Sequence, residues 1–171
     1  MVLSLRHLGL ERIDLHQLHR VDPKIPLEDQ VGELASLQKE GKILHIGLSE
    51  VTIAQIEAAQ RLAPIVSVQN RYNLLDRTSG PVLEYCEANG IGFIPWFPLA
   101  NRDLVAPNGP LGPLAETWGI KPAQLALAWL LGRSPVMLPI PGTAKVAHLE
   151  ENVAAAAVKL SEAQMKALQE L

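Results

Sequence analysis

Short apolar runs alternate with amphipathic stretches along this chain, at about one pair in every 25 residues, and this alternation restricts the fold more than any other feature. The apolar runs have the length of buried strands. Strands are expected at residues 13–19, 43–48, 65–69, 92–97 and 136–140. Because helical stretches separate them, we expect an α/β fold of parallel strands joined by right-handed crossovers, in one domain spanning residues 1–171.

Helices are predicted between the strands from the spacing of apolar residues and from capping residues. They are expected at residues 27–40, 52–61, 81–89, 123–131 and 145–158, with a last helix after Ser161. Thr52 with Gln55, and Ser161 with Gln164, have the spacing of a capping box at a helix start. The Pro- and Gly-rich segment 99–113 is long for a connection and is predicted to be a functional loop.

The composition is typical of a globular protein. Hydrophobic residues make up 48% of the chain, which excludes disordered and fibrous classes. The formal net charge of −3 gives no basis for binding nucleic acid or an anionic membrane, and the longest uncharged run, 88–101, is too short to span a bilayer. Cys86 is the only cysteine, which excludes an internal disulfide and a cysteine-built metal site. Because Arg6, Glu11 and Arg12 also interrupt the N-terminal apolar stretch, we expect a cytoplasmic protein without a signal peptide.

Polar or aromatic residues stand where each predicted strand ends. In parallel α/β folds, ligands meet the carboxyl ends of the strands and the loops that follow them. The residues at these ends are His19, Ser49, Gln69, Asn70, Trp96, Phe97 and the turn 141–143. A single polar strand end is usually structural, but such residues at all five ends of one rim predict a binding site.

Five long stretches carry a resemblance to the aldo-keto reductase family. They are IDLHQLHRVDP (13–23), GKILHIGLSEV (41–51), VSVQNRYNLLDR (66–77), GFIPWFPLA (92–100) and LPIPGTAKVAHLEENVAAA (138–156). The resemblance implies a (β/α)8 TIM barrel that binds NADPH across its rim and transfers hydride to a carbonyl carbon. The match begins near the end of the family's third helix. This chain is therefore expected to form a partial (β/α)8 TIM barrel of about five parallel βα units plus a C-terminal helix.

The resemblance also implies roles for the residues around the nicotinamide. His19 matches the catalytic histidine, whose N–H can donate to the carbonyl oxygen during hydride transfer. Ser49 and Gln69 match the residues that hold the carboxamide, and Asn70 adjoins them. Glu50 departs from the pattern, because many members carry Asn after the serine. His16 lies on the opposite face of its strand, and His7 and His45 match nothing, so all three are expected to be structural.

Further positions match the rest of the dinucleotide. Trp96 matches the aromatic residue on which the nicotinamide stacks, with Phe97 beside it. The remaining expected cofactor contacts are Leu99 and Asn101 near the pyrophosphate, Gly142, Thr143, Lys145 and His148 near the 2′-phosphate, and Glu151 and Asn152 near the adenine. Because the turn before residue 146 offers N–H groups and an ammonium to a phosphate, NADP(H) is expected rather than NADH, although His148 replaces an arginine of many members.

The family's catalytic Asp, Tyr and Lys precede the unit that bears the histidine, and neither Tyr72 nor Tyr85 matches the tyrosine. The resemblance therefore implies an NADP-dependent oxidoreductase that reduces aldehydes or ketones, with little activity from this chain alone. A non-catalytic nucleotide-binding or interaction subunit is the alternative. An independent five-stranded doubly wound domain is a third interpretation.

Five strands cannot close a barrel of eight, which typically takes about 250 residues. Exposing ten aliphatic side chains of the barrel interior, at about 2 kcal/mol each, would exceed the ~5–15 kcal/mol net stability of a domain. We therefore expect a complementary chain, self-association through the open sheet edges, or collapse into an open sheet. The partner of the complemented site would be a small carbonyl compound, selected partly by the loop 99–113.

Overall fold

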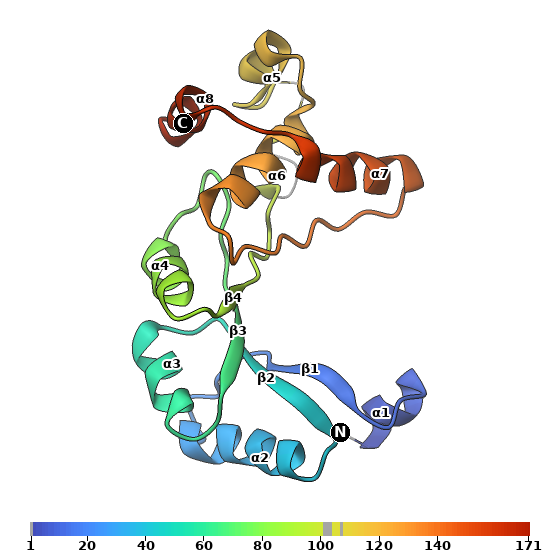
Figure 1. Ribbon diagram of the computed structural model, residues 1–171, viewed down its shortest axis with the longest axis vertical. Coiled ribbons are helices and arrows are strands. Elements are labelled where there is room, and N and C mark those ends of the chain that lie inside the picture. Colours follow the sequence, from blue (N-terminus) through green and yellow to red (C-terminus); the bar gives the residue numbers. More distant parts are fainter. Residues whose placement is uncertain (1, 101–103, 107) are drawn as a thin grey trace.

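A four-stranded parallel sheet forms one half of the molecule (Figure 1). The computed structural model describes residues 2–100, 104–106 and 108–171. The strands are β1 (Ile13–Leu18), β2 (Ile43–Ser49), β3 (Ile65–Gln69) and β4 (Gly92–Phe93), and they lie in chain order. Helices α2 (Leu27–Lys39), α3 (Ile53–Gln60) and α4 (Gly80–Ala88) connect them. This is the partial parallel α/β barrel that the sequence predicts.

The remaining helices gather in the other half, apart from one at the N-terminus (Figure 1). They are α1 (Val2–Leu8), α5 (Gly112–Trp118), α6 (Pro122–Arg133), α7 (Val146–Ala154) and α8 (Glu162–Gln169), with a 3₁₀ turn, η2 (Ala155–Ala157), after α7. Both predicted capping boxes form, at the start of α3 and of α8. No helix in the described part of the chain is long and apolar enough to cross a bilayer.

The core lies between one face of the sheet and the helices. Leu48, Val68 and Phe93 form a row across β2, β3 and β4 and are fully buried. Helices α2, α3 and α4 contribute Val31, Ile56 and Leu83 to the same core, whereas α6 is buried over most of its length. The predicted helices thus cover this face because their apolar residues recur at helical spacing.

The opposite face of the sheet is polar along its central row. Gln17, Gly47 and Ser67 are register partners on β1, β2 and β3, and the Gln17 amide nitrogen donates to Ser67 Oγ across 3.2 Å. A Cβ at position 47 would lie 2.2 Å from Ser67 Oγ, so only glycine fits between the two side chains. The aliphatic face expected for the open barrel interior is therefore absent along this row.

The last two predicted strands are shorter than expected. Residues 92–97 form a strand only at Gly92–Phe93, although Trp96 makes an isolated parallel bridge with Arg71. Residues 136–140 add to the sheet through a single bridge between Met137 and Phe93. The cause is proline, which occurs at positions 95, 135, 139 and 141 and offers no N–H to a strand ladder. The predicted loop 99–113 ends where α5 begins, and residues 101–103 and 107 lie outside the described part.

Candidate functional site

The first predicted site residue, His19, lies one position beyond β1 and its side chain is exposed. His16, three residues earlier, lies within β1 and is half-buried. This burial lowers the pKa of its imidazole. His7 and His45 are exposed. His19, and not His16, therefore lies at the carboxyl end of β1.

Ser49 and Gln69 are register partners at the ends of β2 and β3. The buried Ser49 hydroxyl donates to the backbone carbonyl of Gln69 across 2.9 Å. Because that bond uses the only hydroxyl proton, the Ser49 oxygen offers lone pairs alone to any ligand. The half-buried Gln69 side-chain amide makes no hydrogen bond within the described part of the chain. The pair therefore presents an acceptor beside an amide that both donates and accepts.

Asn70 has a structural role in the connection after β2. Its amide nitrogen donates to the Val51 carbonyl across 2.8 Å, and its amide oxygen accepts from the Val51 N–H across 3.1 Å. Both bonds are buried, so they fix the chain between β2 and α3 against the end of β3. The side chain thus holds the loop on which the neighbouring site residues stand.

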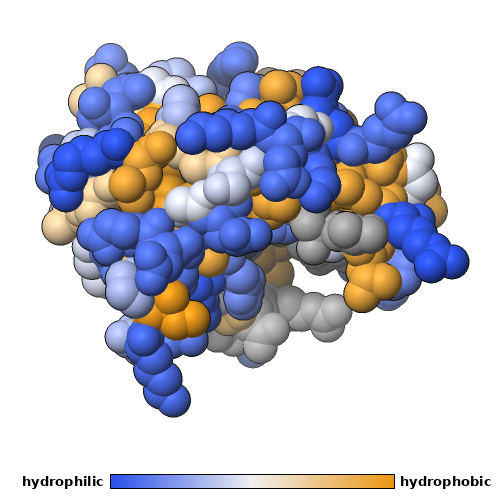
Figure 2. Space-filling model, turned by 90° about the horizontal axis from the view of Figure 1, so that it is seen from below, coloured by the Kyte–Doolittle hydropathy of each residue, from blue (hydrophilic) through white to orange (hydrophobic). Residues whose placement is uncertain are grey.

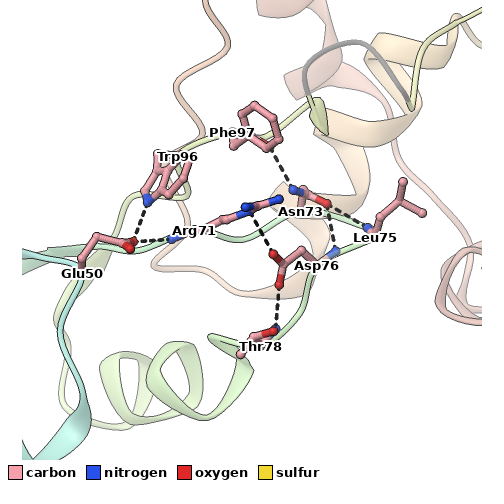
Figure 3. Close-up of polar contacts among 8 residues, drawn as sticks. All are labelled: Glu50, Arg71, Asn73, Leu75, Asp76, Thr78, Trp96 and Phe97. Carbon is pink, nitrogen blue, oxygen red and sulfur yellow. Dashed lines mark hydrogen bonds and ion pairs between the residues drawn. The ribbon is translucent and has the colours of Figure 1, made fainter.

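Trp96 is held at the rim by Glu50, as Figure 3 shows. The indole N–H donates to Glu50 Oε1 across 2.6 Å, and the same oxygen accepts the Arg71 backbone N–H across 3.0 Å. Glu50 has a backbone φ of 57°, in the left-handed region that favours glycine. The hydrogen bonds of its carboxylate offset the cost of that conformation.

Arg71 contacts the rings of both aromatic residues after β4. Its guanidinium carbon lies 5.6 Å from the Trp96 ring centroid and 5.0 Å from that of Phe97, within the range of cation–π attraction. Asp76 pairs with the Arg71 Nε across 2.9 Å and thereby holds the guanidinium in place (Figure 3). Asn73 donates to the Phe97 carbonyl across 3.1 Å, which supports the positive φ of 65° at Phe97.

A cavity of about 630 Å³ lies beside this cluster, between the connections that lead into α3 and α4. Glu50, Asn70, Arg71 and Asp76 line it, together with residues at the starts of the two helices. None of His19, Ser49, Gln69 or Trp96 is in its wall. The cavity therefore adjoins the rim through Glu50 and Asn70 but does not include the other residues predicted at the strand ends.

The predicted phosphate and adenine contacts lie in the half of the molecule that contains α6 and α7 (Figure 1). Gly142, Thr143, Lys145 and His148 are exposed, and Thr143 Oγ1 accepts the Lys145 N–H across 3.1 Å. No hydrogen bond or ion pair between described side chains joins residues 142–152 to the cluster around Trp96. The residues predicted to contact the nicotinamide thus lie near the strand ends, and the residues predicted to contact the phosphate form a separate exposed turn.

Glu151 and Asn152 lie further along α7 and are half-buried. The Glu151 carboxylate forms an ion pair with Lys121 at the start of α6, and this hydrogen bond lowers the pKa of Glu151. Glu151 thus joins α7 to α6. Leu99 is half-buried and packs against the core, whereas Asn101 lies outside the described residues.

Neither tyrosine has its hydroxyl group at the rim, where it could donate a proton to a substrate. Tyr72 is 1% exposed and stacks on Trp129 with ring centroids 5.9 Å apart, and burial raises the pKa of its phenol. Tyr85 donates to Gln60 on the outer helices. Trp129 is buried, and Trp118 is partly buried and packs against the core.

Sequence patterns did not indicate Arg71, Asn73 and Asp76, and they marked Glu50 only as a departure from the family's pattern. The sequence feature that could have indicated them is the pair of opposite charges after two neighbouring strands, Glu50 after β2 and Arg71 after β3. Because parallel strands end at the same edge of a sheet, these two residues must lie close together. Nothing in the linear sequence indicated that Glu50 would accept the indole N–H of Trp96.

The fold and the rim define a class: a partial parallel α/β barrel with polar and aromatic side chains at its strand ends. The family model of the aldo/keto reductase family matches residues 3–108 and 103–171. This chain belongs to the aldo/keto reductase family.

Individual relatives agree with this assignment. An uncharacterized oxidoreductase of Schizosaccharomyces pombe is 54% identical over 161 residues, covering 94% of this chain and 53% of that protein. Pyridoxine 4-dehydrogenase of Escherichia coli is 41% identical over 165 residues, covering 93% and 57%. A crystal structure of a Klebsiella pneumoniae aldo/keto reductase with NADP and acetate is 31% identical with a TM-score of 0.87, covering 98% of this chain and 61% of that one. The chain spans about half the length of the curated relatives that it matches.

Proposed function

We propose that this chain supplies the nicotinamide-binding part of an NADP(H)-dependent oxidoreductase that interconverts aldehydes or ketones and alcohols. The observation that carries the proposal is the hydrogen-bonded pair Ser49–Gln69 at the ends of β2 and β3, with Trp96 at the end of the neighbouring strand. Membership of the family and the NADP bound to the Klebsiella pneumoniae relative support it.

The donor set of the rim fits a carboxamide. The Ser49 hydroxyl donates its hydrogen bond to the Gln69 carbonyl, so Oγ is left to accept a hydrogen bond from a carboxamide N–H. The Gln69 amide can donate to the carboxamide oxygen. NADP(H), when bound, supplies the hydride or takes it up. Ser49 and Gln69 would orient its nicotinamide, and the Trp96 ring would give it a flat surface to stack on.

His19 is proposed as the residue that touches the substrate. Its exposed imidazole follows β1 at the same edge of the sheet as Ser49, because β1 and β2 are parallel. An imidazole N–H directed at a carbonyl oxygen stabilises the negative charge that develops there during hydride transfer. The substrate class is therefore a small carbonyl compound or the corresponding alcohol.

The exposed turn before α7 is proposed to hold the phosphates. Gly142, Thr143 and Lys145 precede a nine-residue helix whose N-cap makes no side-chain hydrogen bond, so backbone N–H groups and an ammonium are available to an anion. This favours NADP(H) over NAD(H). His148 stands where many members carry an arginine, and an imidazole lacks the forked guanidinium that binds a phosphate through two N–H groups, so it adds less to that preference.

We propose that this chain alone reduces carbonyl compounds negligibly, because neither Tyr72 nor Tyr85 lies at the rim to donate a proton. Loss of a positioned general acid commonly costs about 10²–10⁴ in rate.

Complementation through exposed apolar segments, or self-association through them, is the proposed route to a complete site. A non-catalytic nucleotide-binding or interaction subunit is the alternative function. We also propose a cytoplasmic location, since the sequence has a single cysteine, Cys86, which is a free thiol and suits a reducing compartment.

The test is titration of the purified chain with NADPH, followed by the quenching of Trp fluorescence. We expect saturable quenching that is mostly lost in Trp96→Phe and retained in the control Trp118→Phe, because only Trp96 stands at the rim. The same samples are assayed for NADPH oxidation with a simple aldehyde. Absence of quenching in a folded sample contradicts cofactor binding, and ready turnover by the monomer contradicts the proposed need for complementation.

A further inference from the structure

Glu50 contacts residues from the ends of all the other strands. Its Oε1 accepts from the Trp96 indole N–H across 2.6 Å, after β4, and from the Arg71 backbone N–H across 3.0 Å, after β3. Its Oε2 lies 3.9 Å from the Arg20 guanidinium, two residues beyond β1. Glu50 itself directly follows β2. One carboxylate therefore joins the carboxyl ends of the four strands.

The backbone at Glu50 is tied to the nicotinamide side of the rim. The Glu50 N–H donates to the Gln69 carbonyl across 3.0 Å, and this same carbonyl accepts the Ser49 hydroxyl. The left-handed backbone at φ 57° then turns the chain away from the strand. A glutamate here, rather than glycine, accepts a conformational penalty, which indicates that its side chain has a specific task.

That task is visible at Trp96. The Glu50 carboxylate fixes the N–H edge of the indole, and the Arg71 guanidinium lies 5.6 Å from the ring centroid. Arg71 is in turn held by Asp76 and by the contact of its backbone N–H with Glu50 (Figure 3). An indole held at its edge and contacted by a cation has little freedom to rotate about its side-chain torsions.

We propose that Glu50 is a positioning residue for the nicotinamide, which acts by fixing the Trp96 ring in the orientation that stacks on the cofactor. The inference rests on the proposed function. Glu50 need not touch the cofactor: its contribution is that the ring is already ordered before binding, so that less conformational freedom is lost when the dinucleotide binds. In the sequence, this residue was notable only because it replaces an asparagine.

The first measurement needs no cofactor. In ¹⁵N-labelled protein, the three tryptophan indole N–H signals are resolved by NMR, and Trp96→Phe identifies the signal of Trp96. A carboxylate acceptor shifts an indole proton downfield, so we expect an upfield shift of this signal alone in Glu50→Ala. Glu50→Gln keeps an acceptor of the same length and is expected to move the signal less. An unchanged Trp96 signal in Glu50→Ala would show that the contact does not exist in solution.

The second measurement is the dissociation constant of NADPH by isothermal titration calorimetry. Glu50→Ala is expected to weaken binding about tenfold and Glu50→Gln about threefold or less, since a hydrogen bond from the indole survives in the latter. The matched control is Glu84→Ala, which removes an exposed glutamate that also pairs with an arginine, Arg133, on the outer helices. If Glu50→Ala does not fold, Trp96→Phe removes the same N–H and keeps an aromatic ring, and a comparable loss of affinity is expected.

The outcomes separate the two proposals. If NADPH binds and Glu50→Ala, or Trp96→Phe in its place, leaves the dissociation constant within about twofold, the positioning role is overturned while the proposed function stands. If the unsubstituted chain binds no NADPH, the proposed function is overturned, and the role of Glu50 in binding with it. Weaker binding together with an upfield Trp96 signal supports both.

Discussion

At the scale of single residues, close approach and charge explain the rim. Gly47 lets Gln17 and Ser67 meet over β2, because the missing Cβ leaves the space that their hydrogen bond crosses. One carboxylate oxygen of Glu50 accepts hydrogen bonds from both the Trp96 indole and the Arg71 backbone at the carboxyl edge of the sheet. These contacts join β1 to β3 across β2 and tie the ends of β2, β3 and β4 to one another.

The role of Gly47 gives a prediction on stability. Gly47→Ala places a Cβ 2.2 Å from Ser67 Oγ, so the Gln17–Ser67 bond must break or the strands must shift. We expect a loss of about 1–3 kcal/mol in the free energy of unfolding, measured by urea denaturation. The matched control is Gly32→Ala in α2, where nothing lies within 4 Å of the new Cβ, and a gain of about 0.5–1 kcal/mol is expected there. An equal effect of the two substitutions would refute the steric argument.

At the scale of elements, capping decides where the helices begin. The hydroxyl oxygens of Thr52 and Ser161 each accept the backbone N–H of the glutamine three positions later. The side-chain oxygen of that glutamine in turn accepts the backbone N–H of the cap residue. Prolines decide where the strands end, because positions 95 and 139 interrupt two apolar runs that otherwise have strand character. The predicted helices are therefore closer to their expected bounds than the last two strands, whereas α1 and α5 were not predicted.

Removal of one cap should be measurable. Thr52→Ala leaves the Gln55 N–H in the first turn of α3 without its side-chain acceptor, and we expect the free energy of unfolding to fall by about 1 kcal/mol. Thr117→Ala is the control: Thr117 is exposed and its hydroxyl donates only to a carbonyl of its own helix, so we expect a change within about 0.5 kcal/mol. Chemical denaturation of both variants provides the comparison, and a cap variant as stable as the parent chain would argue against the capping box.

At the scale of the whole molecule, eight of the fifteen exposed large apolar side chains in the described part of the chain lie in two segments, whereas Leu15 and Leu44 lie on strands β1 and β2. Leu3, Leu8 and Leu10 stand on and after α1, and Leu138, Ile140 and residues of α7 stand near the other end of the chain. Figure 2 shows apolar patches among hydrophilic side chains on the face that it views. Because the central row of the open sheet face is polar, association is favoured at these segments and not across the whole interior.

Helix α7 carries the most exposed stripe. Val146, Leu149 and Val153 are 73%, 53% and 67% exposed, and their spacing places them on one face. We expect the protein to self-associate as its concentration rises, and the double variant Leu149→Glu/Val153→Glu to stay smaller in light scattering, because charges on this stripe oppose its burial. Leu62→Glu, at an isolated exposed leucine after α3, is the control and should leave the size unchanged. Equal association of the two variants would locate the contact elsewhere.

Sequence by itself determined the class of fold, the order of βα units, the helix caps and the set of residues at the strand ends. These are local properties: apolar periodicity, capping spacing and the residue types that follow each strand depend on neighbours in the chain. Ser49, Gln69 and Trp96 could therefore be named from the pattern and from the resemblance that it carried.

Tertiary structure alone decided which of these residues touch. That Ser49 gives its proton to the Gln69 carbonyl, that Asn70 holds Val51, and that Glu50 accepts the Trp96 N–H all follow from the register of parallel strands and from positive φ angles after them. Contacts of this kind join residues 19 to 46 positions apart, and their geometry depends on packing that no local pattern encodes.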